Sequence, residues 1–349
     1  MNEMDRPLGE AAEQGQTESR EQEKRGGMDA IGGALSRLYP GQEGKYYGTV
    51  IPARLGGKDP LDGIEVWESG NALPHWHYVT YGFSELYDKE CGDPDNSGYG
   101  FELTFRLKKT EEEPPVWPMN LLENLARYVF STGNGFAAGH YIDCSGPVAL
   151  DEETDLTALA FRVDPELGEI DTPNGHLVFL QAEAVTRDEM EALMCWNGVK
   201  FLEQAETILP LGITDLERTS LMKREDFRAA WEKGVQEDGS STRFLYTDEL
   251  DAGRQGGESW LRLGKAHADT ISTMLRARVG KGRPLYLDSR DATVGFRPGD
   301  QAAAELRDGV FTFVLTKEAL EELCLVLHNK KGSCRLEQLP LTVELTPGA

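Results

Sequence analysis

Two aromatic-rich segments between residues 73 and 108 constrain the fold more than any other part of the chain. In the first, every second residue falls on one side of an extended backbone: His75, His77, Val79, Tyr81 and Phe83. In the second, apolar and polar residues alternate: Phe101, Glu102, Leu103, Thr104, Phe105, Arg106, Leu107 and Lys108. A period of two with aromatic and β-branched side chains is typical of strands buried on one face. The acidic, Gly-containing segment 88–99 between them has turn composition. We therefore predict a strand pair with a long connection, placed in the middle of a sheet.

The rest of the chain predicts an α+β protein with two domains, since 349 residues can bury two cores of ordinary size. Residues 1–28 hold few large apolar side chains and predict a disordered acidic tail. Residues 29–233 then form a large domain, and residues 258–349 form a smaller α+β domain. The segment 234–257 is rich in Gly and charged residues, which predicts a linker.

Further elements follow from hydrophobic spacing and capping residues. Helices are expected at 28–39, 118–130, 187–207 with an interruption at Asn197-Gly198, 218–231, 266–279 and 317–327. Additional strands are expected at 46–50, 64–67, 136–144, 158–163, 175–185, 259–263, 284–288, 293–297, 309–315 and 339–345.

The net charge of −24 is concentrated in the large domain. Residues 1–30 carry −4, residues 258–349 carry +1, and residues 31–257 therefore carry −21. A surface of this sign repels nucleic-acid phosphates and accelerates encounter with basic partners. We expect no nucleic-acid partner. The charge is equally compatible with a role in solubility alone.

Cysteine usage and hydropathy indicate a cytoplasmic protein. The five cysteines are scattered, and no pair has the CxxC spacing of a zinc or redox motif, which favours reduced thiols. No apolar run approaches the roughly 20 residues that span a bilayer, so we expect no membrane partner. The first residues, MNEMDRPLGEAAEQG, contain no apolar signal core.

Catalytic motifs with a known mechanism are absent from the sequence. It contains no phosphate-binding glycine motif, no His-Glu-x-x-His and no Gly-x-Ser-x-Gly. The acidic runs 111–113 and 151–153 are typical of solvated loops rather than of two carboxylates placed in one cleft. We therefore predict no catalytic residues and no cofactor, although missing motifs do not exclude an enzyme.

His75 and His77 are the candidate metal ligands, because residues two apart on a strand share a face. Cys91, His140 or a carboxylate could supply a third ligand. The favoured interpretation is structural: both rings, flanked by Pro74, Trp76 and Tyr78, pack and form hydrogen bonds at the start of a strand. The alternatives are a metal-binding protein or enzyme of unknown reaction centred on this pair, or a sensor of a small ligand.

Long strings of uncommon residues resemble the Suppressor of fused family. They are HWHYVTYGFSELY from His75, GYGFELTFRLK from Gly98, YPGQ from Tyr39, LGGKDPLDGIEVW from Leu55, Trp117-Pro118, LARYVF from Leu125, TPNG from Thr172, FLQ from Phe179 and WNG from Trp196. The resemblance covers roughly residues 39–238. It implies two domains, each a mixed β-sheet packed with helices, and a protein-binding module rather than an enzyme.

The resemblance also implies where a partner binds. In animal members the two domains close on a short peptide of a Gli transcription factor, which adds as a strand between them. Tyr128 matches a tyrosine near that peptide. His140 stands where the family has Asp, and Val163 stands where it has Glu, just before Asp164. We therefore take Tyr128, His140 and Asp164 as candidate protein-binding residues.

Without these two acids we expect no binding of a Gli-like peptide, and our hypothesis is that the fold and the interdomain groove persist while the ligand has changed. The chain resembles a microbial member of the family, and such members have been proposed as immunity proteins against secreted toxins. The resemblance and the charge together suggest a protein or peptide partner, with a basic toxin as the specific candidate. Binding would use the acidic surface, the interdomain groove, or both.

Overall fold

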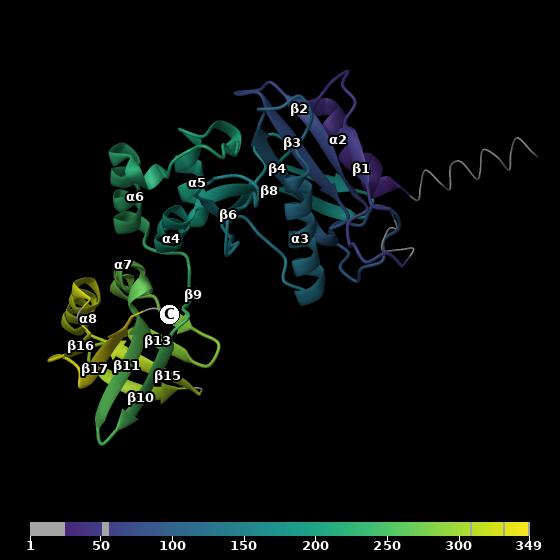
Figure 1. The fold of residues 1–349 in the computed structure, drawn as a ribbon. Helices are drawn as coiled ribbons and strands as arrows, with labels where there is room; N and C mark the ends of the chain where they lie inside the picture. Colours follow the sequence, from purple (N-terminus) through teal and green to yellow (C-terminus); the bar gives the residue numbers. More distant parts are fainter. Residues whose placement is uncertain (1–24, 51–55, 308, 331, 348–349) are drawn as a thin grey trace, which may run out of the picture. The chain divides into compact units, whose positions relative to one another are not determined.

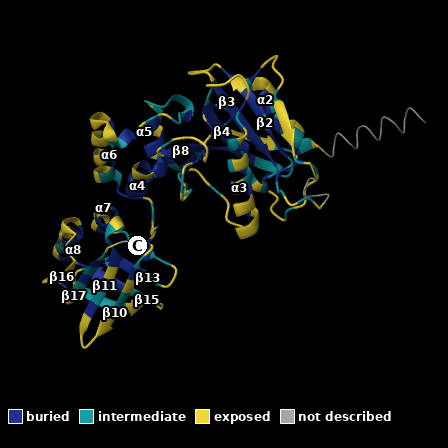
Figure 2. Cartoon of the chain, in the orientation of Figure 1, coloured by how far each residue is buried: buried dark blue, intermediate teal, exposed yellow. Residues whose placement is uncertain are grey.

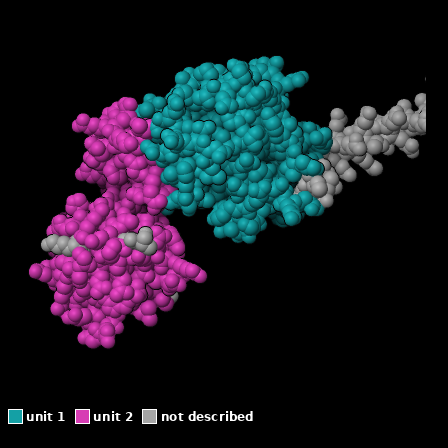
Figure 3. Space-filling model, in the orientation of Figure 1, with its two compact units in different colours: residues 1–184, 206–218 teal, residues 185–205, 219–349 magenta. Residues whose placement is uncertain are grey.

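The computed structural model describes residues 25–50, 56–307, 309–330 and 332–347 (Figure 1). The backbone divides into two compact units (Figure 3). Unit 1 comprises residues 1–184 and 206–218, and unit 2 comprises residues 185–205 and 219–349. Most of the predicted acidic tail, residues 1–24, lies outside the described residues, and residues 26–28 belong to the first described helix.

Unit 1 is built on an eight-stranded mixed sheet. Its strands are β1 (Lys45–Gly48), β2 (Gly63–Ser69), β3 (His75–Tyr81), β4 (Asn96–Lys108), β5 (Tyr141–Asp143), β6 (Leu156–Val163), β7 (Glu169–Thr172) and β8 (Gly175–Thr186). The order is β1-β2-β3-β4-β8-β6-β5, and β7 pairs with β8. β3 and β4 are antiparallel, with His77 opposite Arg106. The predicted strand pair and its central position are both confirmed.

Two helices cover opposite faces of this sheet. α2 (Gly26–Leu38) packs Ile31 and Leu35 against Val79 and Phe179. α3 (Trp117–Thr132) packs its apolar stripe against the other face, where the residues include Tyr78, Leu103, Phe105 and Leu180. α3 ends at Gly133, whose φ of 74° is the left-handed conformation that glycine adopts without strain. The result is a helix–sheet–helix layering.

Because both faces are covered, β3 and β4 are not half-exposed strands. All seven residues of β3 are buried, and Figure 2 shows both strands dark blue over most of their length. The polar residues Glu102, Thr104 and Arg106, which alternate with the apolar ones, are fully buried on the α2 side. The expectation of one buried face is therefore wrong, and the polar alternation marks a second interior rather than a solvent face.

Unit 2 contains two further mixed sheets and most of the remaining helices. Its strands are β9 (Phe244–Tyr246), β10 (Leu250–Gln255), β11 (Glu258–Gly264), β12 (Leu285–Asp288), β13 (Thr293–Pro298), β14 (Ala303–Arg307), β15 (Val310–Leu315), β16 (Ser333–Arg335) and β17 (Leu341–Thr346). Their orders are β10-β11-β17-β16 and β14-β15-β13-β12-β9. The helices are α4 (Arg187–Cys195), α5 (Gly198–Glu206), α6 (Glu225–Asp238), α7 (Ala268–Arg278) and α8 (Lys317–Asn329). The predicted α+β class with mixed sheets is confirmed.

Some segments differ from the sequence expectations. The segment 234–257, predicted as a linker, holds the end of α6 and the strands β9 and β10. β10 pairs Leu250–Gln255 with β11, so backbone hydrogen bonding overrides its Gly-rich composition. The strand predicted at 136–144 is confined to Tyr141–Asp143. The domain boundary itself stays a prediction.

All five cysteines are free thiols, as the sequence predicts. Cys195 and Cys324 are buried and the other three are half-buried. Among the helices of the described ranges, none combines the length and the apolar character that crossing a bilayer requires.

We predict opposite effects for two neighbouring substitutions in α2. Ile31 is fully buried under the sheet, so Ile31→Ala should lower the free energy of unfolding by about 2–5 kcal/mol. A Cβ added at the adjacent Gly32 would meet no atom within 4 Å, so Gly32→Ala should raise it by about 0.5–1 kcal/mol. Denaturant unfolding measures both. Equal effects of the two variants would contradict the packing of α2 described above.

Candidate functional site

A cluster of polar side chains, here called the Arg106 cluster, is buried between α2 and the sheet. It consists of Tyr39 after α2, His75 and His77 on β3, Thr104 and Arg106 on β4, Asp164 and Glu166 after β6, and Gln181 on β8. Arg106, His75 and His77 are fully buried and Asp164 is 1% exposed. A charged pair at this depth is tolerated only when its hydrogen-bonding capacity is filled.

Arg106 is bonded in every direction. Its Nη2 donates to both carboxylate oxygens of Asp164, at 2.7 and 2.9 Å. Its Nη1 donates to Glu166 Oε2 at 2.7 Å, and its Nε donates to Gln181 Oε1 at 3.2 Å. The fork geometry of a guanidinium allows this sharing among partners from different elements. Arg106 therefore ties β4 to β8 and to the segment after β6.

Asp164 is equally well satisfied. Besides Arg106, it accepts hydrogen bonds from Thr104 Oγ1 at 2.8 Å and from the amides of Glu166 and Leu167, both at 2.9 Å. Burial alone would raise the pKa of the Asp164 carboxyl. The charge of Arg106, His77 and these hydrogen bonds outweigh burial, and the pKa lies well below its usual range. Asp164 is therefore an ionised carboxylate in the interior.

The partners of the two histidines fix their tautomers. His75 Nδ1 donates to the carbonyl of Leu73 at 2.7 Å, so its Nε2 accepts from Arg106 Nη1 at 3.1 Å. His77 Nε2 lies 3.2 Å from the Asp164 carboxylate and carries the proton, so its Nδ1 accepts from the Tyr39 hydroxyl at 2.8 Å. Burial lowers the pKa of His77 to about 4 and also lowers that of His75, and the charge of Arg106 adds to both shifts. Both rings are neutral at neutral pH.

This arrangement does not favour the metal or enzyme alternative. Neither imidazole has a lone pair left for a metal ion, because Arg106 and Tyr39 occupy them. Within the described ranges, no group of three or more His, Cys, Asp or Glu residues could hold a metal. Cys91 and His140 are not members of the cluster. The packed, hydrogen-bonded interpretation of the two histidines is the one that the geometry supports.

The surface candidates lie elsewhere in unit 1. Tyr128 is 40% exposed on α3 and stacks on Phe136, with ring centroids 5.8 Å apart. Phe136 stacks in turn on the buried Phe161 of β6, at 4.2 Å. His140 is exposed just before β5, and its carbonyl accepts from the amide of Phe161 at 2.9 Å. Tyr128 and His140 therefore both adjoin this aromatic stack.

Asp164 does not join the other two candidates. Val163 before it is 40% exposed, but the Asp164 side chain points into the Arg106 cluster. Sequence reasoning missed Phe136 and Arg106. The alternation in β4 marks the position of Arg106 in the polar stripe, but it gives no sign that this stripe is buried.

We predict that His77 makes unit 1 sensitive to acid. The unfolded chain takes up a proton near the ordinary histidine pKa of 6.5, whereas folded His77 resists protonation down to about pH 4. The free energy of unfolding should therefore fall by about 3 kcal/mol as the pH drops from 6.5 to 4. His77→Gln should flatten the curve across this window, in denaturant unfolding at several pH values. His176→Gln, at a partly exposed histidine of the same unit, is the control. A slope unchanged by His77→Gln would contradict the prediction.

We predict strong coupling between Arg106 and Asp164. Arg106→Met leaves a buried carboxylate without its counter-charge and should cost about 3–5 kcal/mol of unfolding free energy. Adding Asp164→Asn removes that charge, so the double variant should be more stable than the sum of the single effects predicts. The exposed pair Arg127–Asp59 gives the control, and Arg127→Met should cost about 1 kcal/mol or less. Strict additivity of the two buried substitutions would refute the coupling.

Comparison of the sequence with known proteins identifies relatives of this chain. The family model described as Suppressor of fused protein (SUFU) matches residues 57–219. The Suppressor of fused homologues of Homo sapiens and Mus musculus are each 36% identical over 234 residues, covering 62% of this chain and 48% of theirs. The chain thus spans about half the length of these curated relatives.

Solved structures agree with the sequence comparison. The crystal structure of Drosophila Suppressor of Fused superposes with a TM-score of 0.77 at 21% identity, over 93% of this chain and 98% of that one, so it shows the fold. A chain in the crystal structure of the Sufu-Fu complex is 33% identical, with a TM-score of 0.57, over 62% of this chain and 99% of that one. The chain belongs to the Suppressor of fused family.

Proposed function

We propose that this chain is a non-enzymatic protein-binding module that holds a peptide segment of its partner against the Tyr128–Phe136–Phe161 stack. The main support for this proposal is the stack itself, in which two ring contacts connect an exposed tyrosine to the core. Tyrosine is a favoured anchor in interfaces, since a rigid ring offers contact area at a low entropic cost. A relative of 33% identity is named as part of a complex with a second protein, which supports a binding role.

The neighbours of the stack suggest a peptide unlike the Gli segment that the family resemblance implies. His140 and Val163 are the exposed residues at the positions where the family resemblance implies acids. A histidine and a valine do not offer the fixed negative charges that a basic or His-bearing peptide pairs with. We propose that local selectivity comes from the aromatic stack and His140, and that long-range attraction comes from the −21 charge of residues 31–257.

The finer proposal is that the partner is basic, with a secreted toxin as the specific candidate. Only the charge distribution and the resemblance to microbial family members support it. The site of action would be the cytoplasm, which suits a chain whose five cysteines are all free thiols. Co-expression of the captured partner with and without this chain would test immunity directly, since a toxin should be lethal only when the chain is missing.

The anchor role of Tyr128 gives a direct test of the binding proposal. The full chain is immobilised and exposed to lysate of the source cells at low and at high salt, and retained proteins are identified by mass spectrometry. We expect one basic protein, held at low salt and released at high salt, because exposed charges are screened by salt. Tyr128→Ala should weaken its capture by about tenfold or more, the effect typical of an interface anchor.

A matched variant controls for nonspecific stickiness. Tyr47 on β1 is also 40% exposed. β1 is one edge strand of the sheet, whereas β6, which carries Phe161 of the stack, lies next to the opposite edge strand β5. Tyr47→Ala should leave capture of the same protein intact. Equal capture by Tyr128→Ala and the unaltered chain would remove the stack as the binding site. Retention of no protein at either salt would count against constitutive binding.

A further inference from the structure

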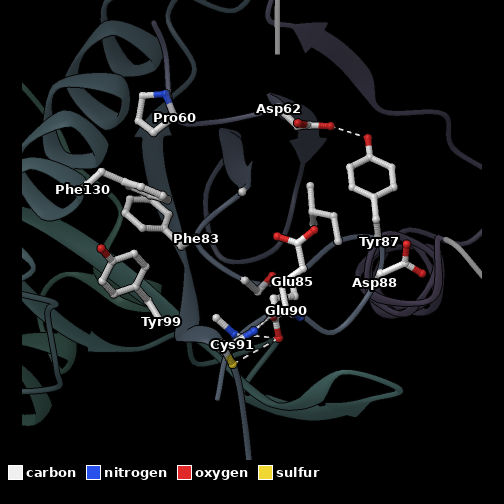
Figure 4. A pocket seen from close by; sticks show the side chains of 14 residues that line it. Pro60, Asp62, Phe83, Glu85, Tyr87, Asp88, Glu90, Cys91, Tyr99 and Phe130 are labelled. Atoms are coloured by element: carbon white, nitrogen blue, oxygen red, sulfur yellow. Dashed lines mark hydrogen bonds between the residues drawn. The ribbon is translucent and has the colours of Figure 1, made fainter. Parts of the chain in front are cut away.

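Unit 1 has an open pocket of about 660 Å³ beside the turn that follows β3 (Figure 4). One side is aromatic and is formed by Phe83, Tyr99 and Phe130. Tyr99 and Phe130 meet edge to face with centroids 5.0 Å apart, and they are 37% and 43% exposed. A cavity of this size lined by partly exposed rings is typical of a site for a small organic molecule.

The opposite side of the pocket is acidic. Asp62, Glu85, Asp88 and Glu90 contribute to its lining, and Figure 4 shows them across the cavity from the three rings. Two of these carboxylates are already engaged. Asp62 accepts from the Tyr87 hydroxyl, and Glu85 accepts from the amides of Glu90 and Cys91. Asp88 and Glu90 are exposed.

Among the described residues that line the pocket, none is Lys, Arg or His. The nearest lysine in sequence, Lys89, does not line the pocket, but it pairs with one of the lining acids, Glu85, and so leaves Asp88 and Glu90 as exposed acids without a cation beside them in the lining. Its Nζ donates to the carbonyls of Asn96 and Asn174 and lies 3.2 Å from Glu85. The pocket therefore combines ring faces with a negative potential, and both features attract a cation.

The floor of the pocket is held by the buried carboxylate of Glu102. Glu102 Oε1 accepts from the amides of Gly82 and Ser84, at 2.9 and 3.0 Å, and from the Ser84 hydroxyl at 2.6 Å. Gly98, at φ +56°, packs so closely that a Cβ would lie 2.6 Å from the carbonyl oxygen of Phe83. These contacts fix the backbone that carries Phe83 and Tyr99.

The backbone of the acidic side of the pocket is held by the side chain of Asn174. Asn174 Nδ2 donates to the carbonyls of Glu85 and Tyr87, at 2.7 and 2.8 Å. Both walls are thus held by buried or half-buried hydrogen bonds before any ligand arrives. Preorganisation of this kind reduces the entropy lost on binding.

We propose that this pocket binds an organic cation with an apolar body, the body lying on Phe83, Tyr99 and Phe130 and the charge facing Asp88 and Glu90. This goes beyond the protein-binding role, because neither Tyr128 nor His140 lines the pocket. The amine serves as the charged group and the rings select a ligand that also carries hydrocarbon. Simple inorganic cations lack the second feature.

Three probes with one carbon skeleton separate charge from hydrophobicity: 4-phenylbutylamine, 4-phenylbutanol and 4-phenylbutanoate. Each is titrated into the full chain and followed by ligand-observed NMR. We expect the amine to bind with a Kd on the order of 1 mM or tighter, which suits a ligand of this size. The alcohol should bind at least about fivefold more weakly, because it lacks the charge that Asp88 and Glu90 attract, and the carboxylate should be weakest, because these acids repel it.

Variants locate the site. Asp88→Asn with Glu90→Gln should reduce affinity for the amine by about fivefold and leave the alcohol unchanged, because only the cation uses the charges. Phe130→Ala should weaken both probes. The control, Asp151→Asn with Glu152→Gln, removes the same charge from an exposed loop that does not line the pocket and should change neither affinity.

Three results would overturn the proposal. They are no binding of the amine, equal affinity for amine and alcohol, and an equal loss in the Asp151/Glu152 control. The last would mean that the amine follows the overall negative charge of the chain. Since Asp88 and Glu90 are exposed, their variants test the site even where Phe130→Ala fails to fold. The protein-binding proposal fails or stands separately, through Tyr128→Ala.

Discussion

The ion pair between Arg106 and Asp164 is the constraint on which unit 1 depends. Removing these charges from water is costly, and only a complete set of hydrogen bonds offsets that cost. The set draws on β3, β4, β8, the segment after β6 and Tyr39, the residue after α2. A one-residue shift in the register of β4 would move Arg106 to the apolar face under α3. Asp164 would then be buried without its counter-charge. The pair therefore adds a polar constraint on the register of the central strands to the one that their apolar side chains impose.

The two proposed binding surfaces meet at the end of α3. Tyr128 stacks on Phe136, whereas Phe130 contacts Phe83 and Tyr99. Residues two apart on an α-helix point about 200° apart around its axis, so one helical turn serves two separate surfaces. The core positions Leu125, Ala126 and Val129 hold this turn against the sheet. One well-packed helix thereby orients aromatic side chains toward the proposed peptide surface on one side and the proposed small-molecule pocket on the other.

The sequence predicts much of the architecture and less of the site. Alternation in β3 and β4, the apolar stripe of α3 and the uncommon strings shared with the family identify the central sheet, its helices and the family. The burial of Glu102 and Arg106 escapes such reasoning, because a polar residue at every second position normally faces water. Their partners Ser84 and Asp164 lie 18 and 58 residues away in the chain, and local spacing carries no sign of those contacts. Short strands such as β9, β14 and β16 are fixed by pairing across the sheet rather than by their own composition.

The parallel pairing of β4 with β8 has a consequence for how the chain reaches this structure. Thr104 lies beside Gln181 in the sheet, although 77 residues separate them in sequence. Such pairings must close long loops before they gain any stabilisation, and chains rich in them fold slowly. Arg106 can bond Asp164 and Gln181 only after α3, β5 and β6 have been placed. Until then β4 carries a charged guanidinium among alternating apolar residues. This charge disfavours pairing of the unfinished strand with other chains. Arg106 thus stabilises the folded sheet and also protects the partly folded chain from aggregation.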